Sequence, residues 1–161
     1  MHSKSIRQRG NQTMANAQQH HSPEVLGDYK HTLSIQTRWM DNDIYGHVNN
    51  VQYYSYFDTV VNRYLIDQGV LDIHQGEVIG LVVETQCNYK KSLAFPETIT
   101  AGLTVTRIGN SSVRYEVGLF KEEEDQPAAQ GHFIHVYVDK QTQRPTALPE
   151  PLRVALEKIV L

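Results

Sequence analysis

A single long helical pattern, followed by an unbroken series of segments with period two, limits the fold more than any other feature of this sequence. Residues 49–68 repeat apolar side chains at the spacing of an amphipathic helix, and Gly69 follows where a left-handed helix cap is favoured. The expected apolar face comprises Val51, Tyr54, Phe57, Val61 and Leu65. After Gly76 the period becomes two, which is typical of strands with one buried face.

Five segments in which apolar and polar residues alternate lie before or after this helix in the sequence. One starts at His31 and precedes the helix, and four follow it, at residues 78–89, 98–108, 112–120 and 130–138. Residues 152–160 can form a short terminal helix. Short connections predict that the last four strands are antiparallel neighbours, and the helix and one face of the sheet must bury each other. The sequence therefore predicts an α+β fold in which a five-stranded antiparallel sheet wraps a long central helix.

The first residues differ in composition from the rest. Residues 1–27 are rich in Gln, Asn, Ser and His and show no periodic apolar pattern. Ordering them would bury too little apolar surface to offset the entropy lost. We expect a flexible N-terminal tail at residues 1–27 and one domain at residues 28–161, which is a usual domain size.

Charge, hydropathy and cysteine content exclude several classes of protein. The net charge is -3, and no basic stripe suited to nucleic acid is present. No apolar run approaches the roughly 20 residues that span a bilayer, and no apolar signal segment opens the chain. Cys87 is the only cysteine, so it has no partner within the chain for a disulfide. We expect a cytoplasmic protein that binds no nucleic acid and does not insert into membranes.

Most of the polar groups that could do chemistry lie between Asp41 and Tyr53, directly before the helix or in its first turn. A helix N-terminus carries unpaired N–H groups and partial positive charge, so it can keep a carboxylate ionised and donate to a developing oxyanion. The residues alone leave two interpretations open. Asp41 and Asp43 are ordinary helix caps, or one of them is a cap while the other is functional.

A short motif in this stretch resembles a known family. The run D-x-x-G-H-V-N-N-x-x-Y, from Asp43 to Tyr53, lies between a strand and a long helix. It resembles the 4-hydroxybenzoyl-CoA thioesterase family of hotdog-fold proteins, and looks closest to the bacterial acyl-CoA thioesterases. The resemblance covers about residues 30–155. It implies a hotdog fold and hydrolysis of an acyl-CoA to free acid and CoA, with no metal or organic cofactor.

The resemblance also implies roles for individual residues. Asp43 matches the catalytic aspartate, as nucleophile or general base, and Asn50 matches the position whose backbone N–H polarises the thioester carbonyl. Gly46, His47 and Asn49 match residues that shape the mouth of the site.

Two further positions complete the expected binding surface. Val48 belongs to the same motif, and Tyr53 is a candidate for the lining of an acyl tunnel, together with Tyr54 and Tyr56. Family members are usually homodimers or homotetramers with the site between subunits. Glu84, in the middle of a strand, is expected at an interface or on the surface, with a second catalytic carboxylate as the alternative.

Other functions remain as alternatives. The similar acyl-carrier-protein thioesterases share much of the pattern but carry Asn where this chain has Tyr45, which leaves the role of His47 open. A non-catalytic acyl-thioester-binding module of the same fold would bind acyl-CoA without releasing thiol. A hotdog dehydratase or hydratase would need an Asp and His pair, which the motif fits poorly.

Overall fold

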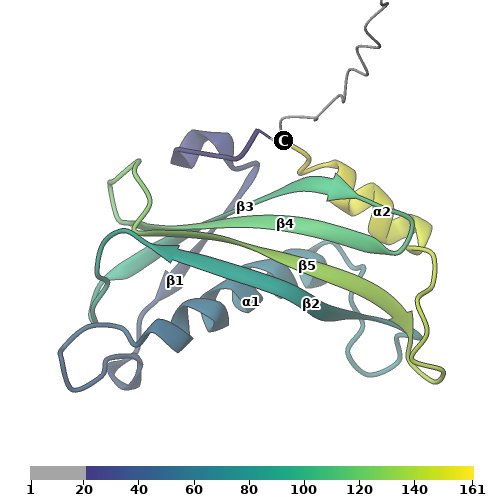
Figure 1. Cartoon of the computed structure of the whole chain (residues 1–161), viewed down its shortest axis with the longest axis horizontal. Coiled ribbons are helices and arrows are strands. Elements are labelled where there is room, and N and C mark those ends of the chain that lie inside the picture. The colour runs from purple at the N-terminus through teal and green to yellow at the C-terminus, as the bar shows by residue number, and fades with distance from the viewer. Residues whose placement is uncertain (1–20) are drawn as a thin grey trace, which may run out of the picture.

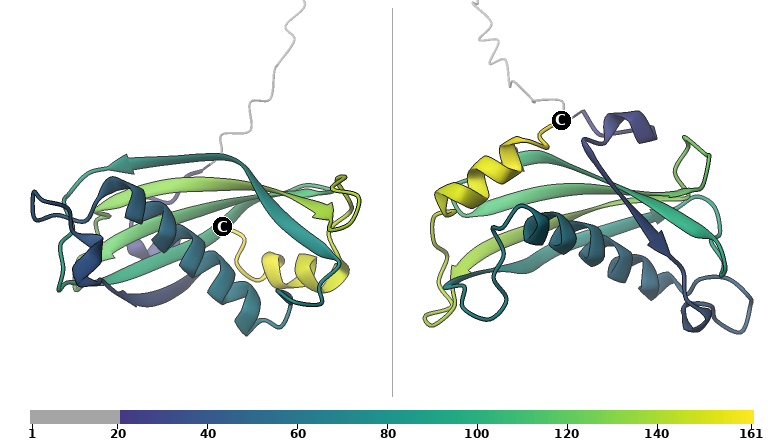
Figure 2. Two further views of the ribbon diagram at one scale, coloured as in Figure 1. Left: turned by 90° about the horizontal axis from the view of Figure 1, so that it is seen from below. Right: turned by 180° about the vertical axis from the view of Figure 1, so that it is seen from behind.

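A long helix lies against the concave face of a curved antiparallel sheet in the computed structural model, which describes residues 21–161 (Figures 1 and 2). Residues 1–20 of the expected tail lie outside the described residues. The elements are η1 (Leu26–Asp28), β1 (His31–Gln36), η2 (Trp39–Asp41), α1 (Asn50–Asp67), β2 (Val78–Tyr89), β3 (Thr98–Ile108), β4 (Ser112–Lys121), β5 (Ala129–Asp139) and α2 (Glu150–Glu157). Together they confirm the expected hotdog architecture, including the short C-terminal helix. Among the described helices, none combines the length and apolar character that crossing a membrane requires.

The order of the strands corrects one expectation. The sheet runs β1-β3-β4-β5-β2, and every pair is antiparallel. β2 therefore pairs with β5 and is not a neighbour of β3. The connection 90–97 explains this, because it runs from one side of the sheet to the other along the start of α1. Lys90 N–H donates to the Ala128 carbonyl, Val48 N–H to the Leu93 carbonyl, and Thr37 N–H to the Glu97 carbonyl at the end of β1.

One face of α1 is buried against the sheet. Its buried residues are Tyr53, Tyr56, Phe57, Val60, Val61, Tyr64 and Leu65. Val51, expected on this face, is 62% exposed, because the buried stripe begins at Tyr53 and the first turn of the helix lies outside it. Asn49 caps the helix by accepting the Val51 N–H at 3.1 Å. Gly69 follows the helix with φ of +70°, as the sequence indicates.

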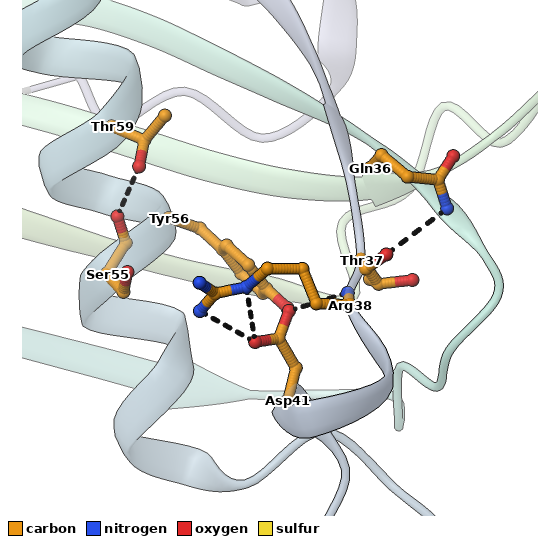
Figure 3. A network of polar contacts seen from close by, with 7 residues as sticks. All are labelled: Gln36, Thr37, Arg38, Asp41, Ser55, Tyr56 and Thr59. Atoms are coloured by element: carbon orange, nitrogen blue, oxygen red, sulfur yellow. Dashed lines mark hydrogen bonds and ion pairs between the residues drawn. The ribbon is translucent and has the colours of Figure 1, made fainter.

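A fully buried carboxylate joins the end of β1 to α1 (Figure 3). Asp41 accepts hydrogen bonds from the Tyr56 hydroxyl at 2.6 Å, the Arg38 backbone N–H at 2.9 Å and the Arg38 Nε at 3.0 Å. Burial raises the pKa of Asp41, but the bonds from Tyr56 and Arg38 outweigh it, so that its pKa lies below the ordinary value. Asp41 is therefore a structural anion that holds the entrance of the helix in place.

A second titratable group is buried between α1 and the sheet. His135, on β5, is 6% exposed, and its Nε2 atom has no hydrogen-bond partner. The ring packs against Tyr115, with ring centroids 5.1 Å apart, and against Phe133 at 5.5 Å. Burial lowers the pKa of His135 to about 4, so the side chain is neutral near pH 7.

Removing the donor to Asp41 should destabilise the fold. In Tyr56→Phe the buried carboxylate loses its shortest hydrogen bond, and we expect a loss of about 1–3 kcal/mol in the free energy of unfolding, measured by urea denaturation. Tyr45→Phe is the matched control, because Tyr45 is 83% exposed and should tolerate the change. A Tyr56→Phe variant as stable as the wild type would contradict this role for the Asp41 network.

Stability should fall in mild acid because of His135. The unfolded chain binds a proton at this residue as the pH falls below about 6.5, whereas the folded protein resists protonation until about 4. The loss between these limits reaches about 3 kcal/mol at most. Burial also lowers the pKa of His31, which acts in the same direction. His135→Asn should flatten the dependence of unfolding free energy on pH. His74→Asn, at an exposed site, is the control and should not change that dependence. Equal slopes in the wild type and both variants would show that His135 does not cause the loss of stability in acid.

Candidate active site

The loop before α1 is a tight turn that displays the Asp43 side chain. Asn42 and Val48 form an antiparallel bridge, and the Asp43 N–H donates to the His47 carbonyl at 2.9 Å. Gly46, with φ of +80°, closes the turn by donating its N–H to the Asp43 carbonyl. The Asp43 carboxylate is half-buried and accepts the Tyr45 N–H at 2.9 Å through one oxygen. Its other oxygen is left for further chemistry.

In the first turn of α1, the Asn50 N–H group has no acceptor among the described residues. Asn49 takes the Val51 N–H with its side chain and the Gln52 N–H with its carbonyl, at 3.1 and 2.9 Å. For the Asn50 N–H, the described residues supply no such partner. Asn50 is exposed and is the first residue of the helix. The positive end of the helix dipole therefore presents a backbone donor to the surface.

A pocket of about 280 Å³ opens at this helix end. Four of the residues expected at the site line it: His47, Val48, Asn50 and Tyr53. Its remaining wall consists of Tyr89, Lys90, Lys91 and Ser92. Tyr89 fixes this wall to the helix, because its hydroxyl donates to the Asn50 carbonyl at 3.1 Å and its ring packs edge-on against that of Tyr53.

The other expected residues lie beside this pocket and not in its lining. Asp43 and Gly46 belong to the adjacent turn, and Asn49 caps the helix. The hydrogen bond between the Asp43 N–H and the His47 carbonyl places Asp43 across the turn from a residue that lines the pocket. Neither Asp41 nor Asp43 caps α1, because Asn49 does so.

Tyr89, Lys90, Lys91 and Ser92 were not anticipated from the sequence. Tyr89 is the last residue of β2 and the other three follow it directly. Only the β2–β5 pairing and the path of the connection 90–97 bring them to the helix end. Two consecutive lysines after a strand are the one signal that could have marked them. Lys90 Nζ donates to Gln130 Oε1 at 2.6 Å, and Lys91 pairs with Glu124 at 2.8 Å.

Several nearby side chains have other roles. Tyr56, a candidate for the acyl lining, hydrogen-bonds Asp41, and Tyr54 is half-buried and stacks on Phe133. Glu84 is exposed on β2 and contacts His132 at 2.8 Å. Burial raises the pKa of the Cys87 thiol to about 11, so it stays protonated near pH 7 and is a poor nucleophile.

Comparison with known proteins agrees with this architecture. The PA5185 protein from Pseudomonas aeruginosa strain PAO1 is 53% identical in sequence, and the match covers 85% of this chain and 96% of that one with a TM-score of 0.83. The PA2801 protein from the same species is 30% identical over 82% of this chain and 98% of its own, with a TM-score of 0.73. A 1,4-dihydroxy-2-naphthoyl-CoA thioesterase from Synechocystis is 18% identical, and it shares the fold over 78% of this chain and 93% of its own, with a TM-score of 0.72.

A match to a family model identifies the family of this chain. The model of the thioesterase-like superfamily matches residues 37–156, which include the turn at Asp43, all of α1 and strands β2 to β5. This chain belongs to the thioesterase-like superfamily.

Proposed function

We propose that this protein hydrolyses acyl-CoA thioesters to a free acid and CoA, with Asp43 as the reacting carboxylate and the Asn50 backbone N–H as the donor to the carbonyl oxygen. The observation that carries the proposal is the Asn50 N–H at the start of α1, which finds no acceptor within residues 21–161 and belongs to a residue that lines a pocket. A preorganised donor at a helix N-terminus stabilises the negative charge that develops on a thioester carbonyl.

The chemistry needs only groups that lie around this helix end. The carboxylate of Asp43 attacks the carbonyl carbon or takes a proton from an attacking water molecule. Electrons move to the carbonyl oxygen, which accepts the Asn50 N–H, and then return to expel the CoA thiolate. Water supplies the oxygen of the free acid, directly or by hydrolysing an acyl-aspartyl intermediate. Membership of the thioesterase-like superfamily supports this type of reaction.

The lysines of the pocket wall support CoA as the leaving group. Lys90 hydrogen-bonds a neutral amide, so its positive charge is not cancelled by that partner. Positive charge on a residue that lines the pocket would attract the phosphates of CoA, as cations do at other phosphate sites.

The exposed edge strand β2 supports a homodimer. β2 lies at the border of the sheet, with its second edge unpaired among the described residues, yet it exposes Leu81, Val82 and Val83 by 39%, 48% and 59%. Long apolar edge strands tend to pair with another chain. We propose that two copies pair β2 antiparallel about a two-fold axis, which would bring the helix mouth of each chain to the interface.

Replacing the Asp43 carboxylate should slow turnover sharply. Asp43→Asn keeps an oxygen that can accept the Tyr45 N–H but removes the charge, and we expect kcat/KM to fall by about a hundred- to ten-thousandfold. Release of thiol from a panel of acyl-CoA substrates measures this, and thermal melting checks the fold. Asp125→Asn, in an exposed loop, is the control and should behave as wild type. Unchanged turnover in Asp43→Asn would remove Asp43 from the mechanism, and binding without any thiol release would favour a non-catalytic module.

A charge in the middle of β2 should separate the dimer. Val83 lies near the centre of the strand, so Val83→Asp would place two carboxylates close together at a two-fold axis. We expect sedimentation velocity to show monomers for Val83→Asp and dimers or larger assemblies for the wild type. Thr32→Asp, on the opposite edge strand β1, is the control and should not change the mass. A Val83→Asp protein that sediments as the wild type would exclude the β2 interface.

A further inference from the structure

A second cavity lies at the opposite end of α1 from the helix mouth. Its volume is about 360 Å³. The walls come from the later turns of α1, the loop that follows it, and the first residues of β2 with facing residues of β5. They are mainly apolar and include Leu65, Leu71, Ile73, Ile79 and Tyr137. A cavity of this size and character is typical of a small-molecule site.

A buried polar ring lies in this mainly apolar wall, which also includes Asn62 and Asp72. His135 lines the cavity, although only 6% of its surface is exposed. Its Nε2 atom is sealed from solvent without a partner. Its Nδ1 atom lies at the wall formed by Gly80, where an added Cβ would be only 3.2 Å away. The missing side chain at Gly80 leaves Nδ1 uncovered.

The cost of leaving a buried N–H group without an acceptor determines which nitrogen of His135 carries the proton. Because His135 is buried and neutral near pH 7, it carries a single N–H. A buried N–H without an acceptor is rarer in proteins than an under-satisfied acceptor. The proton therefore belongs on Nδ1, and the sealed Nε2 keeps a lone pair. His135 thus presents a buried hydrogen-bond donor to a mainly apolar cavity, whose other polar side chains, Asn62 and Asp72, are half-buried and exposed respectively.

Within one chain this cavity is far from the helix mouth. The residues from Asn50 to Leu65 cover about 22 Å of helix axis. The proposed dimer removes this separation. If β2 pairs antiparallel about its centre, Ile79 and Gly80 at the start of one strand lie opposite Asn88 and Cys87 near the end of the other. The cavity of each chain would then adjoin the mouth of its partner.

We propose that His135 is the specificity-determining residue for the acyl group, and that its Nδ1–H donates to an oxygen on an acyl chain held at the partner's helix mouth. The preferred substrates would then be acyl thioesters that carry a keto or hydroxyl oxygen along an otherwise apolar chain. This inference rests on the proposed thioesterase function and on the β2 dimer.

A scan of oxygen positions tests the donor. The substrates are octanoyl-CoA and the series from 4-oxooctanoyl-CoA to 7-oxooctanoyl-CoA, whose ketones can only accept hydrogen bonds. We expect at least one keto substrate to exceed octanoyl-CoA about tenfold in kcat/KM, as one buried hydrogen bond allows. His135→Phe should abolish this preference while still hydrolysing octanoyl-CoA. A ratio that is the same in the wild type and His135→Phe at every position would overturn the proposal.

Three variants separate the donor atom from the shape of the side chain. His135→Asn places an amide near the position of Nδ1 and should keep part of the keto preference. His135→Gln places its amide near the position of Nε2 and should lose it. His132→Asn is the control, because His132 lies on the same strand but contacts Glu84 on the other face of the sheet. Equal loss in the Asn and Gln variants would contradict Nδ1 as the donor.

A binding measurement keeps the failure of catalysis apart from the failure of this inference. Thioether analogues of octanoyl-CoA and oxooctanoyl-CoA cannot be hydrolysed, and calorimetry gives their affinities. If no acyl-CoA is turned over, the proposed hydrolysis is wrong, yet a keto preference in binding that His135→Phe removes would still support the donor. The absence of any such preference would overturn it.

Mixed dimers test which chain supplies the cavity. Asp43→Asn and His135→Phe chains, refolded together, form dimers in which each active Asp43 faces the intact His135 of the other chain. We expect the keto preference, absent in His135→Phe alone, to return in the mixture. If it does not return, the cavity does not serve the partner's mouth.

Discussion

The buried carboxylate of Asp41 is the constraint on which the proposed site depends. A fully buried anion requires charged or hydrogen-bonding partners, and Asp41 obtains them from Arg38 on one side and Tyr56 on the other. Its backbone carbonyl also accepts the Asn49 N–H, at the cap of α1. The end of β1 and the start of α1 are thereby held together. The short turn between them can project Asp43 beside the helix end only because both of its ends are fixed.

The difference in burial thus gives Asp41 and Asp43 different roles, although they are only two positions apart. Asp41 has every oxygen engaged and lies inside, whereas Asp43 is half-buried on a turn and engages one oxygen with the Tyr45 N–H. The sequence left open which of them was structural. Part of the answer was visible in the spacing of Arg38 and Asp41, but the hydrogen bond from Tyr56 joins residues on different elements, which no local pattern reveals.

The sequence predicted those parts of the fold that depend on local periodicity. The switch from helical spacing to period two gave α1 and the strands nearly at their observed bounds, and Gly69 marked the end of the helix. The predicted neighbours of β2 were wrong. A short connection normally joins adjacent strands, whereas the connection 90–97 crosses the helix end, where successive hydrogen bonds hold it. The same crossing brings Tyr89 and the two lysines to the pocket, so the error in topology and the missed wall have one cause.

The composition of β2 is hard to explain for an isolated chain. Consecutive apolar residues from Leu81 to Val83 are typical of a strand buried on both faces, and edge strands usually carry charges or prolines that prevent pairing. Here the strand is an edge and these side chains are exposed. A second β2 beside it would turn the edge into the middle of a larger sheet, for which the sequence is suited. The same pairing would set the uncovered His135 ring next to a helix mouth, so that sheet assembly and substrate selection would follow from one contact.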